Sequence, residues 1–224
     1  MVYILMVVLL VLQTIATSAA PASTGDANRP LSVLLVGNYR PTLAAARALH
    51  DGGYRVVIGA EPGSTGAEKS RFVNEIWRIP EEDLNPNSFP RALAERLRID
   101  PSIAFVLPMN ENSLRLVDGA REAIPMHIHL VMPQHEPLRV CLDKLTWLRF
   151  CRDIGVPCPP FAAASSLTEL RQIVTDIGCP VVVRPTEAGK RMWHRKALTI
   201  DTLEDFDKLF PKWPEDLREL LVQR

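Results

Sequence analysis

The stretch LSVLLVGNYRPTLAAARALHDGGYRVVIG, residues 31–59, decides the fold class. It opens with a short apolar run, residues 31–36, which is typical of a strand buried on both faces. A helix is predicted over residues 41–51, because proline opens it and Gly52-Gly53 ends it. Residues 54–59 form the next apolar, β-branched run. A strand, a helix and a strand in this order predict an α/β fold with a parallel sheet.

The same alternation continues along the chain. We expect a helix over 89–97, a strand over 103–107, a helix over 112–123 and a strand over 127–132. These elements predict a first domain, residues 31–140, built as an open, mostly parallel, Rossmann-like sheet with helices on both faces.

A second region, residues 141–224, has a different character. Asp143 is predicted to cap a helix that ends before Gly155, since its carboxylate accepts orphan backbone N–H groups. Helices over 168–177 and 203–210 and strands over 180–184 and 220–223 complete an α+β region.

The first 30 residues read as a leader and linker. Residues 2–12 are uniformly apolar, no charged side chain precedes Asp26, and small residues follow at 17–20. This pattern is similar to a secretory signal, although the usual basic n-region is missing. An uncleaved membrane anchor, a buried helix and a misassigned translation start are the open alternatives.

Composition excludes several classes of protein. The 224 residues are 47% apolar and 23% charged, unlike a disordered, collagen-like or coiled-coil chain. Lys and Arg total 26, as do Asp and Glu, so no global field draws the chain to nucleic acid, although a local basic patch is compatible with this balance. The four cysteines have no metal-binding spacing, and we expect free, mostly buried thiols in a reducing compartment.

Several familiar motifs are absent or incomplete. The turn after the first strand, Gly37-Asn38-Tyr39-Arg40, lacks the glycines of a dinucleotide site. The stretch GSTGAEKS, residues 63–70, has its lysine displaced from the P-loop position, so a plain glycine-rich loop is expected. No G-x-S-x-G elbow occurs. His127 and His129 would share a strand face, where packing is expected rather than a metal site.

The informative constellation lies in the second region. Asp143-Lys144 opens a helix, and GVPCP follows at 155–159. GCPVVVRP at 178–185 then leads into TEAGKR at 186–191. In this order the motifs resemble the ATP-grasp family, and its carbamoyl-phosphate-synthase branch in particular. The preceding domain, with Val106-Leu107-Pro108 before Asn110-Glu111, is similar to a pre-ATP-grasp domain. The resemblance covers residues 31–224.

The resemblance implies an ATP site. It assigns Lys144 and Arg184 to the α- and β-phosphates, and Gln223 to the adenine amino group. Cations suit phosphates, and arginine can bind one bidentately. The flap that closes over the phosphates departs from the family pattern: it has one glycine, Gly189, with Lys190 and Arg191 beside it. Taken singly, Lys144 and Arg184 would be surface charges, the latter in an ion pair.

The resemblance also implies a reaction. The complete enzyme would use ATP and Mg²⁺ to phosphorylate a carboxylate substrate, and an amine or similar nucleophile would displace the phosphate. The family's metal ligands lie in the half that would follow residue 224, so no metal ligand is assigned here and little turnover is expected from these residues alone. The rival hypothesis is a degenerate, non-catalytic ATP-grasp module that binds a nucleotide or a protein partner.

Localisation follows from the leader. ATP use favours the cytoplasm, with residues 2–20 as an anchor in contact with the membrane, whereas a cleaved signal peptide over 1–20 would mean export. No nucleic-acid partner is expected, and assembly as a homodimer stays open.

Overall fold

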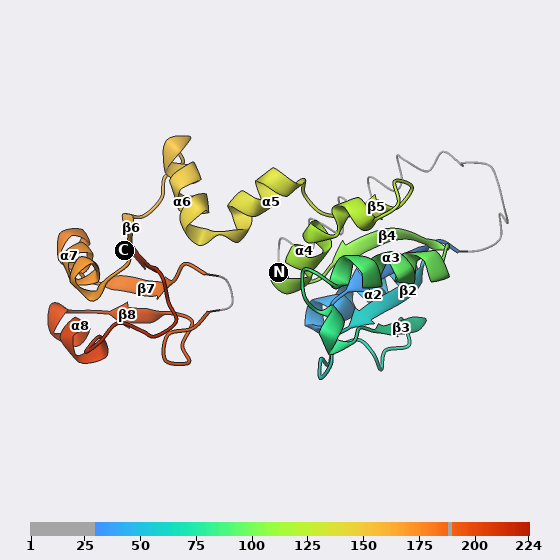
Figure 1. Cartoon of the computed structure of the whole chain (residues 1–224), viewed down its shortest axis with the longest axis horizontal. Helices are drawn as coiled ribbons and strands as arrows, with labels where there is room; N and C mark the ends of the chain where they lie inside the picture. Colours follow the sequence, from blue (N-terminus) through green and yellow to red (C-terminus); the bar gives the residue numbers. More distant parts are fainter. Residues whose placement is uncertain (1–29, 188–189) are drawn as a thin grey trace. The chain divides into compact units, whose positions relative to one another are not determined.

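The computed structural model describes residues 30–187 and 190–224, which divide into two compact units (Figure 1). The first unit ends at Pro133 and the second runs from Gln134 to Arg224. The division therefore falls ahead of residue 140, and helix α5 (His135–Leu142) lies wholly in the second unit.

The predicted leader, residues 1–29 with its signal or anchor, lies outside the described residues, as does Gly189. Within the described ranges, no helix has both the length and the apolar character needed to cross a membrane.

The first unit is a parallel α/β sheet. Its five strands have the order β3-β2-β1-β4-β5, and every neighbouring pair is parallel. In chain order the elements are β1 (Ser32–Val36), α2 (Arg40–Asp51), β2 (Arg55–Ala60), β3 (Glu75–Arg78), η1 (Glu81–Asp83), α3 (Phe89–Ile99), β4 (Ile103–Pro108), α4 (Glu111–Gly119), η2 (Arg121–Ala123) and β5 (His129–Leu130). The predicted Rossmann-like sheet is confirmed.

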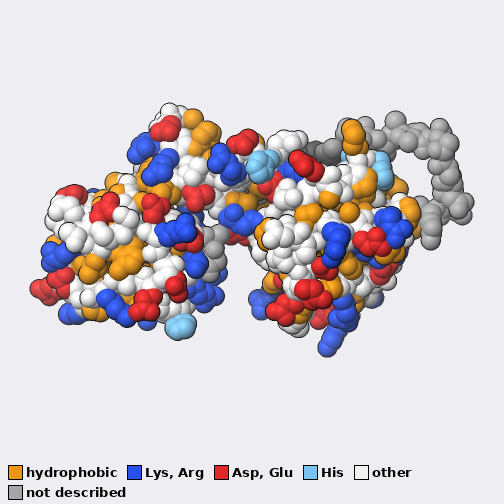
Figure 2. Space-filling view, viewed as in Figure 1, with side chains coloured by type: hydrophobic (Ala, Val, Ile, Leu, Met, Phe, Trp, Pro, Cys, Tyr) orange, Lys and Arg blue, Asp and Glu red, His pale blue; other side chains and the backbone are white. Residues whose placement is uncertain are grey.

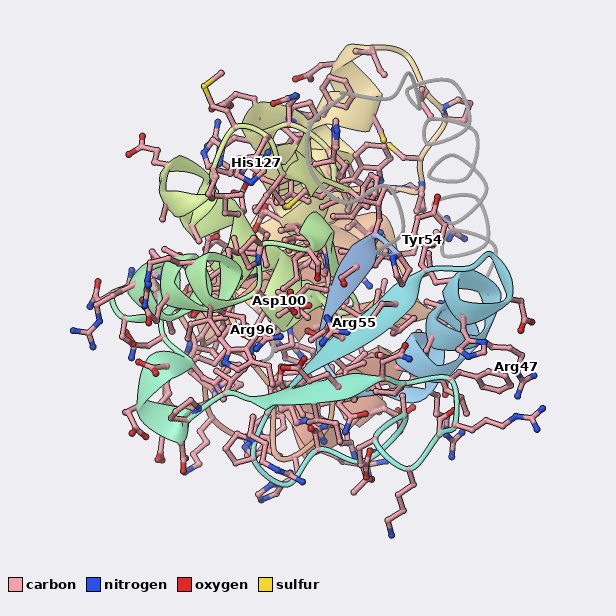
Figure 3. The ribbon with its side chains drawn as sticks, turned by 90° about the vertical axis from the view of Figure 1, so that its right-hand side faces the viewer. Arg47, Tyr54, Arg55, Arg96, Asp100 and His127 are labelled. Carbon is pink, nitrogen blue, oxygen red and sulfur yellow. The ribbon has the colours of Figure 1, made fainter. Side chains whose placement is uncertain are left out.

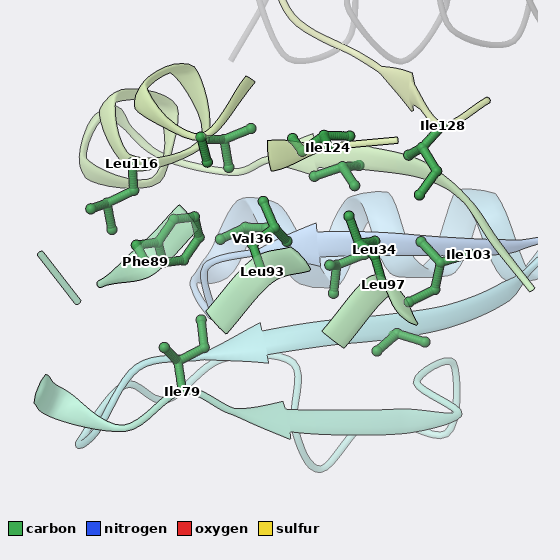
Figure 4. Close-up of a cluster of buried hydrophobic side chains, with 14 residues drawn as sticks. Leu34, Val36, Ile79, Phe89, Leu93, Leu97, Ile103, Leu116, Ile124 and Ile128 are labelled. Atoms are coloured by element: carbon green, nitrogen blue, oxygen red, sulfur yellow. The ribbon is translucent and has the colours of Figure 1, made fainter. Parts of the chain in front are cut away.

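Strand β1 joins the two cores of this unit, because its side chains alternate between the faces of the sheet. Leu34 and Val36 pack with side chains of α3 and α4, among them Phe89, in the cluster drawn in Figure 4. Val33 and Leu35 pack on the other face with side chains of α2. All five residues of β1 are buried. Burial on both faces explains why the strand reads as an unbroken apolar run.

Charged side chains close the end of the sheet where its strands begin. Arg55 and Arg96 each contact both Glu75 and Asp100. Figure 3 labels Arg55, Arg96 and Asp100 of this group, which line a cavity of about 370 Å³. The network ties β2, β3 and the end of α3 together.

The second unit is an antiparallel sheet with helices on both faces. Its four strands have the order β6-β9-β7-β8. The elements are α5, α6 (Lys144–Asp153), β6 (Phe161–Ala164), α7 (Leu167–Ile177), β7 (Val181–Pro185), β8 (Leu198–Ile200), α8 (Leu203–Leu209) and β9 (Leu220–Gln223). The predicted α+β character of this region is confirmed.

Two buried clusters show which helices cover which face. Leu170 of α7 and Phe206 of α8 pack with Leu220 and Val222 of β9 in the larger cluster. Leu221, the residue between them, packs on the opposite face. Its neighbours there include two leucines of α6. Helix α6 therefore covers the second face around β9.

Four predictions about local structure need correction. The strand expected over 127–132 is only His129–Leu130, because it pairs with just Phe105 and Val106 at the edge of the sheet. His127 lies before it in an exposed turn, so the two histidines do not share a strand face. His129 stacks on Phe105, with ring centroids 5.3 Å apart.

The helix expected over 112–123 stops at Gly119, and a separate 3₁₀ turn follows. Glycine is a poor helix former, which explains this early end. The cysteines are free thiols, as predicted, but only Cys151 is buried; Cys141 is exposed and the other two are half-buried.

Candidate functional site

Arg184 lies on the face of the second sheet that α7 and α8 leave uncovered. Along β7, Val181 and Val183 are buried in the cluster beneath those helices. Val182 and Arg184 alternate with them and are half-buried on the other face. The sequence placed an arginine on this strand, and the structure fixes the side of the sheet on which it stands.

Gln223 stands beside Arg184 on the same face. The antiparallel register sets Arg184 opposite Leu221 and Val182 opposite Gln223, so Arg184 and Gln223 are diagonal neighbours. The Nη2 group of Arg184 donates a hydrogen bond to Oε1 of Gln223. The Nε atom of Arg184 is buried and has no hydrogen-bond partner among the described residues. Such a guanidinium retains donors for an incoming anion.

Arg184 forms no ion pair with any described residue, so the structure does not bear out the interpretation of this arginine as half of a surface ion pair. Its guanidinium instead donates a hydrogen bond to the neutral amide of Gln223. A guanidinium without a carboxylate partner keeps its charge available to an anion.

Lys144 is the first residue of α6. Asp143 caps the helix as predicted, accepting a hydrogen bond from the Thr146 backbone N–H at 2.7 Å. Leu145 and Leu148 then pack on Leu221, the residue opposite Arg184. Leu221 of β9 therefore contacts α6, which carries Lys144, and is paired with β7 at Arg184. Lys144 is half-buried.

Lys190 and Arg191 belong to an exposed basic hairpin, residues 190–196. Backbone hydrogen bonds in both directions, 2.8 and 2.7 Å, join Met192 to Arg195. Trp193 and His194 form the turn, with φ values of 43° and 67°. This is the geometry of a two-residue hairpin turn that usually contains Asn and Gly.

The basic hairpin is fixed to the unit. Met192 is fully buried and Trp193 makes an edge contact with Phe210, with ring centroids 5.1 Å apart. Arg191 Nη1 donates to the His194 carbonyl at 3.2 Å. Residues 190–196 carry four Lys or Arg side chains and no acid. Elsewhere on the face drawn in Figure 2, acidic and basic side chains are interspersed.

The glycine-rich loop after β2 is held by hydrogen bonds to the turn between β1 and α2. Asn38 is fully buried; it donates to Glu68 at 2.7 Å and accepts from the Ala67 backbone N–H at 2.7 Å. Hydrogen bonds from Asn38 and from the Gly66 backbone N–H hold the pKa of Glu68 below its usual value. Tyr39 donates to Glu61, which raises the pKa of the phenol to about 12. These hydrogen bonds fasten the loop across the β1–α2 turn.

The Mg²⁺ ion that the family resemblance implies has no fitting ligand set in this part of the chain. Across residues 30–187 and 190–224, no three His, Cys, Asp or Glu side chains gather in a way that could hold a metal ion. No role is therefore assigned to a metal ligand here.

No family model matches the chain. The carbamoyl phosphate synthase large chain of Thermotoga neapolitana is 28% identical over 178 residues, which cover 68% of this chain and 16% of that protein. The chain thus spans a small part of the curated relatives that it matches.

Solved structures agree on the fold. The L-amino acid ligase of Bacillus licheniformis has a TM-score of 0.61 at 12% identity, over 88% of this chain and 44% of that one. The N5-carboxyaminoimidazole synthetase of Staphylococcus aureus, complexed with ADP, has a TM-score of 0.60 at 14% identity, over 87% and 46%.

In fold and in the order of its motifs the chain is similar to proteins of ATP-grasp type, the class that its sequence predicts. The relatives that it matches include the carbamoyl phosphate synthase large chain. Of the predicted site residues, the structure brings Arg184 and Gln223 into contact and sets Lys144 on the helix that covers the same face. Lys190 and Arg191 belong to the basic hairpin. The sequence analysis identified these basic side chains but did not predict the hairpin turn.

Proposed function

We propose that the second unit binds ATP on the sheet face that carries Arg184 and Gln223. One observation supports this most directly: Arg184 is a half-buried cation with an unused buried donor and no carboxylate partner among the described residues. The triphosphate is the part of ATP that such a group would bind, because a guanidinium can donate two parallel hydrogen bonds to phosphate oxygens.

The other predicted residues would share the phosphates. Lys144 would approach from the start of α6, where a helix N-terminus also favours negative charge. Lys190 and Arg191 would supply charge from the basic hairpin, and Gly189, outside the described residues, would supply backbone donors.

The activity of the complete protein is a further proposal. We infer an ATP-dependent ligase that activates a carboxylate as an acyl phosphate, which an amine or similar nucleophile then attacks. The names of the similar proteins support this class: they include carbamoyl phosphate synthase, an L-amino acid ligase and D-alanine–D-alanine ligase. Residues Lys144 and Arg184 would offset the charge that develops during phosphoryl transfer, which is mainly an electrostatic task.

Isothermal calorimetry with ATP tests the site. Lys144→Ala and Arg184→Ala should each weaken binding about 10- to 100-fold, since a charge-assisted hydrogen bond contributes roughly 1.5–3 kcal/mol. Arg149→Ala is the matched control for Lys144, because it removes an exposed cation from the same helix. Arg171→Ala is the control for Arg184, because α7 covers the opposite face of the sheet.

If ATP binds and neither Lys144 nor Arg184 matters, the site assignment is wrong. If wild type binds no nucleotide, the proposal fails and a module that recognises a protein partner replaces it. ATP use also favours a cytosolic location with residues 2–20 as an anchor. Mass spectrometry of the mature N-terminus tests this, and cleavage near residue 20 would contradict it.

A further inference from the structure

The hydrogen bond between Arg184 and Gln223 fixes which way the Gln223 amide faces. Arginine has donors and no acceptor, so the atom that meets Arg184 must be Oε1 of Gln223 and not Nε2. The amide nitrogen therefore points away from Arg184. A direct contact between Oε1 and an adenine amino group would compete with the bond that already occupies this oxygen.

A neutral partner has a specific electrostatic effect on an arginine. A carboxylate at position 223 would orient the guanidinium and also cancel its charge. Glutamine orients it and leaves the charge intact. Arg184 is half-buried, its Nε is without a partner among the described residues, and no described acid contacts it. The Arg184 guanidinium is thus oriented by Gln223 and keeps its full positive charge.

We propose that Gln223 is a positioning residue for Arg184 and acts on the phosphate end of the ligand, not on the base. This inference rests on the proposed ATP site and refines it. It differs from the role that the family resemblance implies for Gln223, which is recognition of the adenine amino group. The two roles predict opposite responses to ligands with and without a base.

Calorimetry with three probes separates them: ATP, inorganic tripolyphosphate, which has no base, and adenosine, which has no phosphate. Gln223→Glu should weaken ATP and tripolyphosphate about 10- to 100-fold, because the new carboxylate pairs with Arg184. Gln223→Met, which removes the acceptor and adds no charge, should weaken both by a smaller factor. Adenosine affinity should change less than twofold in either variant.

A double-mutant cycle tests whether the effect passes through Arg184. In an Arg184→Ala background, Gln223→Glu should have little further effect on tripolyphosphate. An equal effect in both backgrounds would mean general repulsion and overturn the proposal. Thermal unfolding of each variant verifies that the sheet is intact, and Gln223→Met provides the comparison if Gln223→Glu does not fold.

Failure of the inference can be told apart from failure of the proposed function. If wild type binds ATP and Arg184→Ala weakens it, but Gln223 variants weaken adenosine and spare tripolyphosphate, Gln223 reads the base and the positioning role is wrong. If wild type binds neither ATP nor tripolyphosphate, the proposed function is wrong and the inference falls with it.

Discussion

Asp100, which follows α3, accepts a hydrogen bond from Arg55 of β2 at 2.7 Å, although the two residues are 45 positions apart. Burial by itself raises the pKa of Asp100, but hydrogen bonds from Ser102 and Arg55 and the charges of Arg55 and Arg96 outweigh it and hold the pKa below its usual value. The carboxylate is therefore more stable in the folded unit than in the unfolded chain.

This relationship predicts a pH dependence. A depressed folded-state pKa contributes stability above the unfolded value near 4, and this contribution is lost as the pH falls through the folded value. Asp100→Asn should lower the stability of the first unit at pH 7 by about 1.5–3 kcal/mol, since it removes the charged partner of hydrogen bonds from Arg55 and Arg96. The difference from wild type should shrink as the pH falls toward about 3.

Hydrogen exchange of β1 and β2 amides measures this stability for the first unit alone. Glu95→Gln is the control, because Glu95 pairs with Arg98 on the exposed side of α3. A difference between Asp100→Asn and wild type that stays constant from pH 7 to 3 would contradict the assignment.

Gly66 should not tolerate a side chain. A Cβ at this position would lie 2.8 Å from the carbonyl carbon of Tyr39 and 2.9 Å from its oxygen, and backbone atoms cannot move aside easily. Gly66→Ala should destabilise the loop by roughly 1–3 kcal/mol, as overpacking does elsewhere. Gly119→Ala is the matched control, since nothing lies within 4 Å of its Cβ; it should be neutral or stabilising. Urea unfolding compares the two, and equal effects would refute the packing argument.

Leu221 should be needed to seat α6. It belongs to β9 and is fully buried beneath α6. Leu221→Ala should reduce stability by about 2–5 kcal/mol, because it leaves a cavity beneath Leu145 and Leu148. Trp147 lies on the same helix and is 43% exposed, so Trp147→Ala should change stability by less than about 1 kcal/mol. Denaturant unfolding of the second unit measures both; a smaller loss for Leu221→Ala than for Trp147→Ala would show that α6 is held by other contacts.

The hairpin turn should accept glycine at its second position. His194 has a φ of 67°, a region in which glycine is unstrained and most side chains are not. His194→Gly should stabilise the basic hairpin by roughly 0.5–1 kcal/mol, whereas Trp193→Gly should weaken it through loss of the Phe210 contact. Exchange rates of the Met192 and Arg195 amides report the change. Faster exchange in His194→Gly would contradict this prediction.

The sequence predicts best the elements that are buried on both faces or capped locally. Strand β1 reads as one apolar run because both its faces are covered, and α6 is predicted because the Asp143 cap and the Leu145–Leu148 spacing lie within one helix. The register that sets Arg184 beside Gln223 joins residues 39 positions apart, and no local pattern encodes it.

Three strands and one α-helix escape prediction for identifiable reasons. Strand β3, EIWR, is a half-buried edge strand; β6, FAAA, is dominated by alanine; and β8 has three residues. Helix α5 contains a proline in its first turn, and it ends at the residue before the cap of α6. From the sequence alone, the region before Asp143 is therefore taken for the boundary between the two domains. Pairing with neighbouring strands, and not intrinsic propensity, stabilises the three strands.

Strand β9 has a consequence for the order in which the protein can fold during synthesis. It lies between β6 and β7, yet it is made after both. Among the described residues β6 pairs with β9 alone, so its pairing must wait for residues 220–223. The first unit has no such delay, since its central strand is the first to be made. As the chain emerges from the ribosome, the first unit should therefore fold while the strands of the second unit still have unpaired edges. Exposed strand edges of this kind are prone to aggregation and are protected by chaperones.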